Sequence, residues 1–235
     1  MRKGEIRKRE LLAAAERLFF SKGYAETTIS DILESQGCSK GSFYHHFESK
    51  LQILSALCVE HASVSFERYQ EKIKEIIDPL QKFDVLLYGT LTTTPEEEEM
   101  CFLLMPLISL PEGEEVLSAL LNAQRALLLP EMKKVLEELK EKKLAFYPCP
   151  ALPEVAWDAH MGLNRRLLLL GKDMKEADEK SRRAVQEALD AARYLLERTL
   201  DLPFGSVTII KAPVLFDTLS RAARHMEDIK KEQPQ

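Results

Sequence analysis

The sequence predicts an all-α protein in which short N-terminal helices form a helix-turn-helix unit, joined by one long helix to a larger helical body. Apolar residues recur at helical spacing over most of the 235 residues. Capping residues and prolines stand at the starts of several of these segments. No stretch alternates strands with helices, and no internal repeat is visible. We therefore divide the chain into a head over 1–50 and a helical body over 51–235.

Residues 5–21 are predicted to form an amphipathic helix that supplies the floor of the head. Five apolar residues share one side of it: Leu11, Ala14, Ala15, Leu18 and Phe19. Gly23 follows as a C-terminal stop, and Tyr24 is expected to pack back on the helix. Its N-terminal arm is basic, with Arg2, Lys3, Arg7, Lys8 and Arg9. This arm either reaches phosphates or is a solvated helix end.

Residues 28–50 hold three predicted helix starts. Three polar residues can each cap a helix: Thr28, Ser39 and Ser49. Asp31 and Gln52 lie three residues after the first and last of them and would complete capping boxes. Gly37 stands where a sharp reversal needs a positive φ. Helix, glycine turn and short helix together predict a helix-turn-helix.

The short second helix of this unit carries the chemistry. Phe43 and Phe47 are four residues apart, so they share one face and anchor the helix in a small core. The side chains left outward are Lys40, Ser42, Tyr44, His45 and His46. A cation, hydroxyls and imidazoles on a free helix face suit a groove of nucleic acid. Lys40 and Lys50 would attract phosphate, capped helix N-termini at Thr28 and Ser39 would add N–H donors, and Gly41 would allow close approach.

The distribution of charge along the chain agrees with nucleic-acid binding by the head. The net charge is −5, but residues 1–50 hold nine Lys or Arg and seven Asp or Glu, a balance of +2. The rest of the chain holds 24 and 31, a balance of −7. A slightly basic head on an acidic body is compatible with a protein that touches DNA at one end only.

The body is predicted to be helical throughout. A long helix should run from Ser49 to about Lys74, followed by helices over 80–91, 114–143 with a kink at Pro130, 153–171, 175–201 and 213–229. Thr94 is predicted to cap a further helix, with Glu97 as its box partner. The glutamates at 96–99 either favour that helix N-terminus and are solvated, which we expect, or form a cation site. Val207–Ile210 is β-branched and is expected to be briefly extended.

The run from Thr27 to Ile32, the run from Gly37 to Phe47, and Lys50 resemble the DNA-binding domain of TetR-type (TetR/AcrR) transcriptional repressors. The resemblance covers about a fifth of the chain. It implies DNA contacts, mostly with phosphates, from residues at the matching positions, and we expect the full set to be Thr28, Ser39, Lys40, Gly41, Ser42, Tyr44, His45, His46 and Lys50. Leu33, Gln36 and Cys38 depart from the usual small or apolar residues, and all three concern the packing of the turn.

The resemblance also implies a partner and a mechanism. One short helix reads little sequence, so a two-fold homodimer on a palindromic operator with half-sites ~34 Å apart, or a multiple of that, is expected. The helices at 153–171 and 175–201 resemble the pair that forms the dimer interface in this family, although a monomer core would look similar. In this family a small-molecule effector bound in the body releases the DNA. A ligand-independent DNA-binding or architectural dimer and a ligand-dependent activator are the alternatives.

Candidates for the effector site are residues of the middle helices that combine apolar and polar groups, and each could equally be core. We expect them to be Phe66, Tyr69, Phe102, Met105, Gln124, Trp157, His160, Met161 and Asn164. Arg125 and Arg165 could meet an acidic ligand or pair with nearby glutamates.

Other classes of protein receive little support. No nucleophile elbow, phosphate loop or HExxH motif is present, so we expect no enzyme and no cofactor. His45 and His46 lack a third ligand at helical spacing, so no metal site is expected. No apolar run reaches the ~20 residues that cross a bilayer, and no export signal precedes the first helix. With four scattered cysteines, we expect reduced thiols in a cytoplasmic protein.

Overall fold

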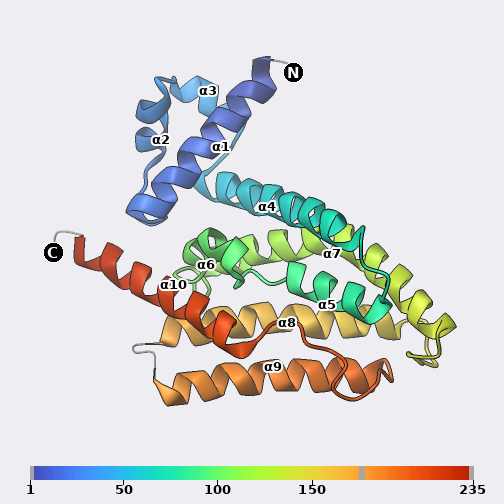
Figure 1. Ribbon diagram of the computed structural model, residues 1–235. Coiled ribbons are helices and arrows are strands. Elements are labelled where there is room, and N and C mark those ends of the chain that lie inside the picture. The colour runs from blue at the N-terminus through green and yellow to red at the C-terminus, as the bar shows by residue number, and fades with distance from the viewer. Residues whose placement is uncertain (1–2, 175–177, 233–235) are drawn as a thin grey trace.

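The computed structural model describes residues 3–174 and 178–232, which form helices and irregular connections without a strand. The all-α prediction is confirmed (Figure 1). The helices in chain order are α1 (Lys3–Lys22), α2 (Ile29–Gln36), α3 (Lys40–Tyr44), α4 (Lys50–Ile73), α5 (Pro79–Gly89), the 3₁₀ turn η1 (Pro95–Glu97), α6 (Glu98–Leu104), α7 (Pro111–Glu141), α8 (Leu152–Asp173), α9 (Glu179–Thr199) and α10 (Ala212–Glu232). None of the helices in these described ranges is long and apolar enough to cross a membrane.

The head consists of α1, α2 and α3, with the start of α4 closing its base. Leu11, Phe19, Ile32 and Phe43 are at most 1% exposed and form its core. The ring of Tyr24 meets Phe19 edge-on at 5.1 Å between centroids, so the predicted back-packing is confirmed. α4 leaves the head as one uninterrupted helix and runs over the body (Figure 1).

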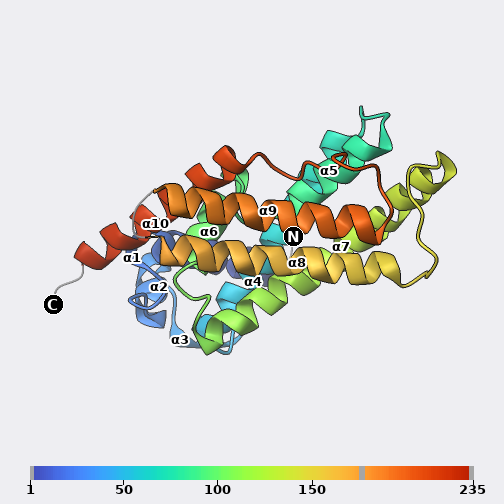
Figure 2. The ribbon, with the colours of Figure 1, turned by 90° about the horizontal axis from the view of Figure 1, so that it is seen from below.

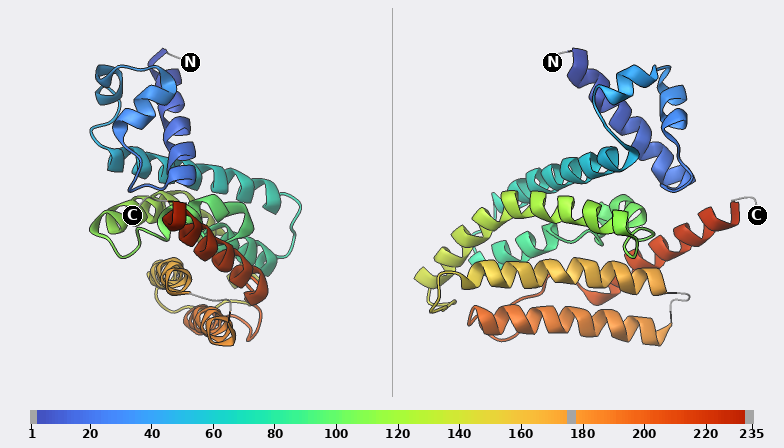
Figure 3. Two further views of the ribbon diagram at one scale, coloured as in Figure 1. Left: turned by 90° about the vertical axis from the view of Figure 1, so that its left-hand side faces the viewer. Right: turned by 180° about the vertical axis from the view of Figure 1, so that it is seen from behind.

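The body is a layered bundle. α4 packs along α7, and α5 packs against both. α8 and α9 lie side by side on the face of the body opposite the head, which Figure 2 views directly. α10 crosses back from this pair toward the head, packing on α6, α8 and α9. α7 continues through Pro130 and bends along its length (Figure 3).

Three local predictions are wrong. Thr94 makes no side-chain cap, and the chain enters a 3₁₀ turn there. Val207–Ile210 is not extended throughout, because Ile209 has a φ of 55°. Glu197 accepts from the Val207 N–H at 3.0 Å, and Asp84 accepts from the next two N–H groups at 2.8 and 3.3 Å. Gln52 caps the Glu48 N–H at 2.6 Å, one residue earlier than a capping box requires.

The prediction of solvated glutamates at 96–99 is wrong for Glu97, because an ionic cluster around it joins the head to the body, whereas Glu96 and Glu99 lie exposed. Glu97 is 6% exposed. Its carboxylate accepts from Ser65 at 2.6 Å and from Arg68 at 2.7 Å, and lies 3.5 Å from His61 Nδ1. His61 Nε2 is 3.0 Å from Glu16 of α1. His61 therefore bridges a carboxylate of the head and a carboxylate of the body.

The protonation of this Glu97 cluster follows from its geometry. Burial acts to lower the pKa of His61, but hydrogen bonds to Glu16 and Glu97 outweigh it and raise the pKa to about 9. Burial acts to raise the pKa of Glu97, and its bonds to His61, Ser65 and Arg68 overcome this and lower the pKa. The bond to His61 likewise lowers the pKa of Glu16. At neutral pH the bridge is therefore a charged imidazolium between two carboxylates.

Candidate nucleic-acid interface

The N-terminus of α2 is fixed by reciprocal hydrogen bonds between Thr28 and Asp31. The Thr28 hydroxyl accepts from the Asp31 N–H at 3.1 Å, and the Thr28 N–H donates to the Asp31 carboxylate at 2.8 Å. Lys22 donates to the same carboxylate at 2.7 Å. These bonds, that of Lys22 first, lower the pKa of Asp31 to about 2. The predicted capping box is confirmed, and Thr28 lies on the exposed surface.

The turn between α2 and α3 has the geometry that its glycine permits. Gly37 has φ 58° and ψ 36°, in the left-handed region. Its N–H donates to Glu34 O at 3.2 Å, and the Cys38 N–H donates to Leu33 O at 3.0 Å. Leu33 is buried beneath the turn, and the half-buried Cys38 sulfur accepts from Arg7 of α1 at 3.4 Å. Leu33 and Cys38, which depart from the family pattern, thus stabilise the turn through contacts on its inner side.

α3 presents a polar face because its two phenylalanines hold it from below. Phe43 and Phe47 are 0% and 2% exposed. Ser39 caps the helix by accepting from the Ser42 N–H at 3.3 Å. The predicted contact residues of this segment that lie exposed are Ser39, Lys40, Gly41, Tyr44 and His45, with Ser42 and His46 half-exposed. The Tyr44 ring is 56% exposed even though its edge meets Phe43, so its hydroxyl is available on the surface.

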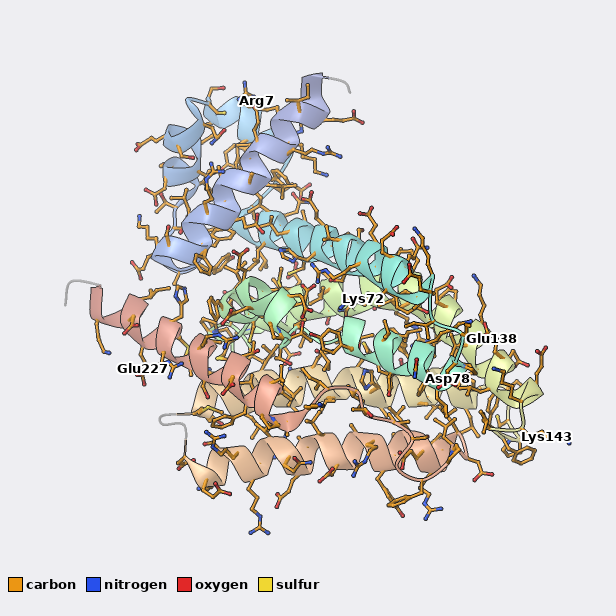
Figure 4. The ribbon with its side chains drawn as sticks, in the orientation of Figure 1. Arg7, Lys72, Asp78, Glu138, Lys143 and Glu227 are labelled. Carbon is orange, nitrogen blue, oxygen red and sulfur yellow. The ribbon has the colours of Figure 1, made fainter. Side chains whose placement is uncertain are left out.

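The N-terminal half of α1 adds positive charge beside this face. His46 stacks edge-on against His45 at 4.8 Å between ring centroids. Partial burial lowers the pKa of His46, and so do the charges of His45, Lys8 and Arg7. Lys8 Nζ stands 5.7 Å from the centre of the Phe47 ring. Arg7 marks the end of α1 that lies next to α3 (Figure 4). α1 and α3 therefore form one cationic edge at the top of the head.

Lys50 has a role that the sequence did not suggest. Its ammonium group donates to the carbonyls of Tyr24, Ala25 and Thr27 at 2.7, 3.2 and 2.8 Å. An ammonium has three donors, so all of them are in use inside the head. Burial lowers the pKa of Lys50, and Glu26 and Asp31 oppose that shift. Lys50 fastens the loop between α1 and α2 to the start of α4, and its predicted contact with phosphate stays a prediction.

The nine effector-site candidates do not meet in one place. Seven are at most 5% exposed: Tyr69, Met105, Gln124, Trp157, His160, Met161 and Asn164. Phe66 and Phe102 are half-buried. Phe102 lies toward the head, in a ring cluster with Phe20 and His225. The two arginines considered with these candidates pair on the protein: Arg125 with Glu154 and Asp158, and Arg165 with Glu114.

Three of the candidates converge on Thr90, at the end of α5. Gln124 and Asn164 both donate to the Thr90 carbonyl, at 3.0 and 2.9 Å. The Thr90 hydroxyl donates to Leu87 O at 2.6 Å and lies 2.8 Å from His160 Nε2. Since the hydroxyl proton is used on Leu87, His160 Nε2 must be the donor, which leaves Nδ1 as an acceptor. Burial lowers the pKa of His160 to about 4, so the ring is neutral at pH 7.

This Thr90 cluster has unused acceptors. His160 Nδ1 and Gln124 Oε1 are buried and have no hydrogen-bond partner, and the hydroxyl of the adjacent Thr93 has none either. Buried polar atoms are normally paired, because an unpaired one loses its hydration without compensation. The Thr90 cluster therefore offers two buried acceptors to a molecule with hydrogen-bond donors.

Comparison with known proteins places the head among characterised domains. Residues 11–57 match the family model for bacterial regulatory proteins of the tetR family. The HTH-type transcriptional repressor KstR2 of Mycolicibacterium smegmatis is 38% identical over 84 residues, which are 36% of this chain and 41% of that protein. The HTH-type transcriptional regulator TtgR of Pseudomonas putida is 42% identical over 48 residues, 20% of this chain and 23% of that protein. The match with KstR2 therefore spans about two fifths of that relative's length.

Solved structures extend the likeness to the fold of most of the chain. The fatty acid degradation regulator FadR from Bacillus halodurans superposes with a TM-score of 0.56 at 15% identity, covering 83% of this chain and 97% of that one. FadR from Bacillus subtilis in complex with stearoyl-CoA gives 0.52 at 17% identity, covering 82% and 97%. At these identities the likeness concerns the fold alone.

Proposed function

We propose that this chain, whose residues 11–57 match the family model for bacterial regulatory proteins of the tetR family, is a transcriptional repressor that binds a palindromic operator as a homodimer and is released by a small-molecule effector. The observation that carries the proposal is the exposed polar face of α3, held outward by two buried phenylalanines beside the cationic edge of α1. α3 enters the major groove, where Lys40 and Ser42 meet base edges. The capped N-terminus of α2 at Thr28 and the hydroxyl of Tyr44 contact the flanking phosphates.

Dimerisation through α8 and α9 is supported by the surface of that pair. A shallow groove between the two helices is lined by small residues, among them Ala159, Gly162, Ala184, Ala188 and Ala191. Small side chains let a facing helix approach closely. Val155, Tyr194 and Leu195 are 57%, 56% and 41% exposed on the same helices, which is apolar area that a second copy would cover. The pair faces away from the head, so two copies joined there leave both heads free (Figure 2).

The effector is proposed to bind at the Thr90 cluster, where it donates hydrogen bonds to Gln124 Oε1 and His160 Nδ1. These acceptors lie on α7 and α8, and α7 packs along α4, which carries the head. A ligand that separates α7 from α8 would shift α4 and change the distance between the two heads. It can do so only to the extent that it binds the DNA-free form better than the DNA-bound form. Stearoyl-CoA, the ligand of one structural neighbour, is a rational first probe.

DNA binding is tested by selecting an operator from random DNA with the full-length protein and measuring affinity by fluorescence anisotropy against salt. Tyr44→Phe should weaken binding to all sequences alike, whereas Lys40→Ala and Ser42→Ala should change the preferred bases, each costing about 1–3 kcal/mol of discrimination. Lys142→Ala, an exposed lysine at the far end of α7, is the matched control and should change nothing. Unaltered affinity and preference in all three head variants would rule out α3 as the reader.

The effector step has its own test. Gln124→Leu and His160→Phe remove the two acceptors without opening a large cavity. A ligand that lowers operator affinity in the native protein should lose that effect in both variants while operator affinity without ligand is kept. A ligand that acts equally well on both variants would place the effector site elsewhere in the body.

A further inference from the structure

A cleft between the head and the body lies outside the sites described above. It has a volume of about 200 Å³. Its walls come from three parts of the chain: Phe19, Phe20 and Tyr24 of the head, Phe102, Leu103 and Leu107 of the body, and Met226 and Ile229 of α10. Figure 1 shows these elements meeting where α10 reaches the lower end of α1. A space of this size holds a single-ring organic molecule.

Three stacked rings form part of the cleft wall. Phe20, Phe102 and His225 form a cluster with centroids 4.6 to 5.6 Å apart and planes inclined by 20° to 24°. His225 Nε2 donates to the Phe20 carbonyl at 3.1 Å, which fixes the imidazole against α1. Ring faces carry partial negative charge, so they attract cations and flat apolar groups.

The charged groups around the cleft are mainly acidic. Glu26 lines it directly and is exposed. Burial and then the charges of Glu112 and Glu115 raise the pKa of Tyr24, so these two carboxylates add negative potential at this wall. A cation, Lys50, stands 4.3 Å from the centre of the Tyr24 ring, and its donors are already bound to backbone carbonyls. Three carboxylates beside aromatic walls disfavour an anion and favour a cation.

We propose that this junction cleft binds a compact aromatic organic cation, whose ring lies against Phe20 and Phe102 and whose charge faces Glu26. Such a ligand contacts α1 and α6 at the same time. It therefore fixes the angle between head and body, independently of the effector at the Thr90 cluster.

The test is isothermal titration calorimetry on the full-length protein without DNA, with three compounds that share a phenyl ring. Benzyltrimethylammonium should bind with a Kd below about 1 mM. Benzyl alcohol should bind at least about fivefold more weakly and phenylacetate more weakly still, because they lack the positive charge. Equal binding of the cation and the alcohol would overturn the assignment of ligand class, and no binding of the cation would overturn the site.

Variants locate the site. Glu26→Gln and Phe102→Ala should each weaken the binding of benzyltrimethylammonium by about fivefold or more. Leu110→Trp should abolish binding by filling the cleft from a lining position that is 45% exposed, so the fold tolerates it. Glu141→Gln and Phe204→Ala, exposed residues of the same types elsewhere on the body, are the matched controls. Retained affinity in Leu110→Trp and Glu26→Gln would place the cation elsewhere and refute the proposal. No DNA enters this experiment, so its result is independent of operator binding.

Discussion

Replacing His61 by glutamine should remove a pH-dependent part of the stability of the head–body junction. His61 is bound between Glu16 and Glu97, and its side chain is 23% exposed. Its pKa is raised from 6.5 to about 9. A group whose pKa is higher in the folded state than in the unfolded state stabilises the fold. This stabilisation is complete at pH values below the unfolded-state pKa, and it disappears as the pH rises through the folded-state pKa.

The magnitude follows from that shift. Below pH ~6.5, where His61 is charged in both the folded and the unfolded protein, a pKa shift of this size adds about 3 kcal/mol to the free energy of unfolding. At pH ~7.5 about 2 kcal/mol remains, because protonation of the unfolded histidine is by then incomplete. At pH ~9.5 almost nothing remains. Glutamine can still donate a hydrogen bond to one carboxylate, but it carries no charge at any pH.

Urea denaturation followed by circular dichroism measures this loss of stability. All samples are kept at one protein concentration, because dimerisation would shift the midpoint. The native protein should exceed His61→Gln by about 2 kcal/mol in free energy of unfolding at pH ~7.5, and the two should converge by pH ~9.5. Lysine, tyrosine and cysteine titrations are common to both proteins and cancel in the difference. His45→Gln, on the exposed face of α3, should match the native protein throughout. A difference between native and His61→Gln that does not change with pH would refute the charged bridge.

Two further predictions concern glycines whose surroundings differ. Gly113→Ala should lower the free energy of unfolding by more than about 2 kcal/mol in thermal or urea denaturation. The new Cβ would clash with the Leu107 carbonyl oxygen, which is backbone and cannot rotate away. A neutral result would contradict this packing. A Cβ added at Gly162, by contrast, would meet no atom within 4 Å in its own protomer, so Gly162→Leu should keep the helix content. In sedimentation experiments it should weaken the homodimer by about tenfold or more, and a dimer of native strength would exclude the α8–α9 face as the interface.

The sequence alone determined the features whose partners lie within a few residues. The caps of α2, α3 and α4 at Thr28, Ser39 and Ser49 are bonds within one helical turn, and the structure contains all three. The αL glycine at 37 and the anchoring of α3 by two phenylalanines four residues apart are equally local. The local spacing of residues was therefore sufficient to predict the helices and the outward face of α3.

The tertiary structure decided the features whose partners are distant in the chain. Glu97 looked like one of four solvated glutamates, but Ser65 and Arg68 arrive from α4, 32 and 29 residues earlier. Lys50 looked like a free cation until the carbonyls of a loop more than 20 residues away took its three donors. The junction cleft joins Phe20, Phe102 and His225, which no spacing rule connects. Hydrogen bonding within a turn is encoded by adjacent residues, whereas burial and ion pairing depend on which helices the folded core brings into contact.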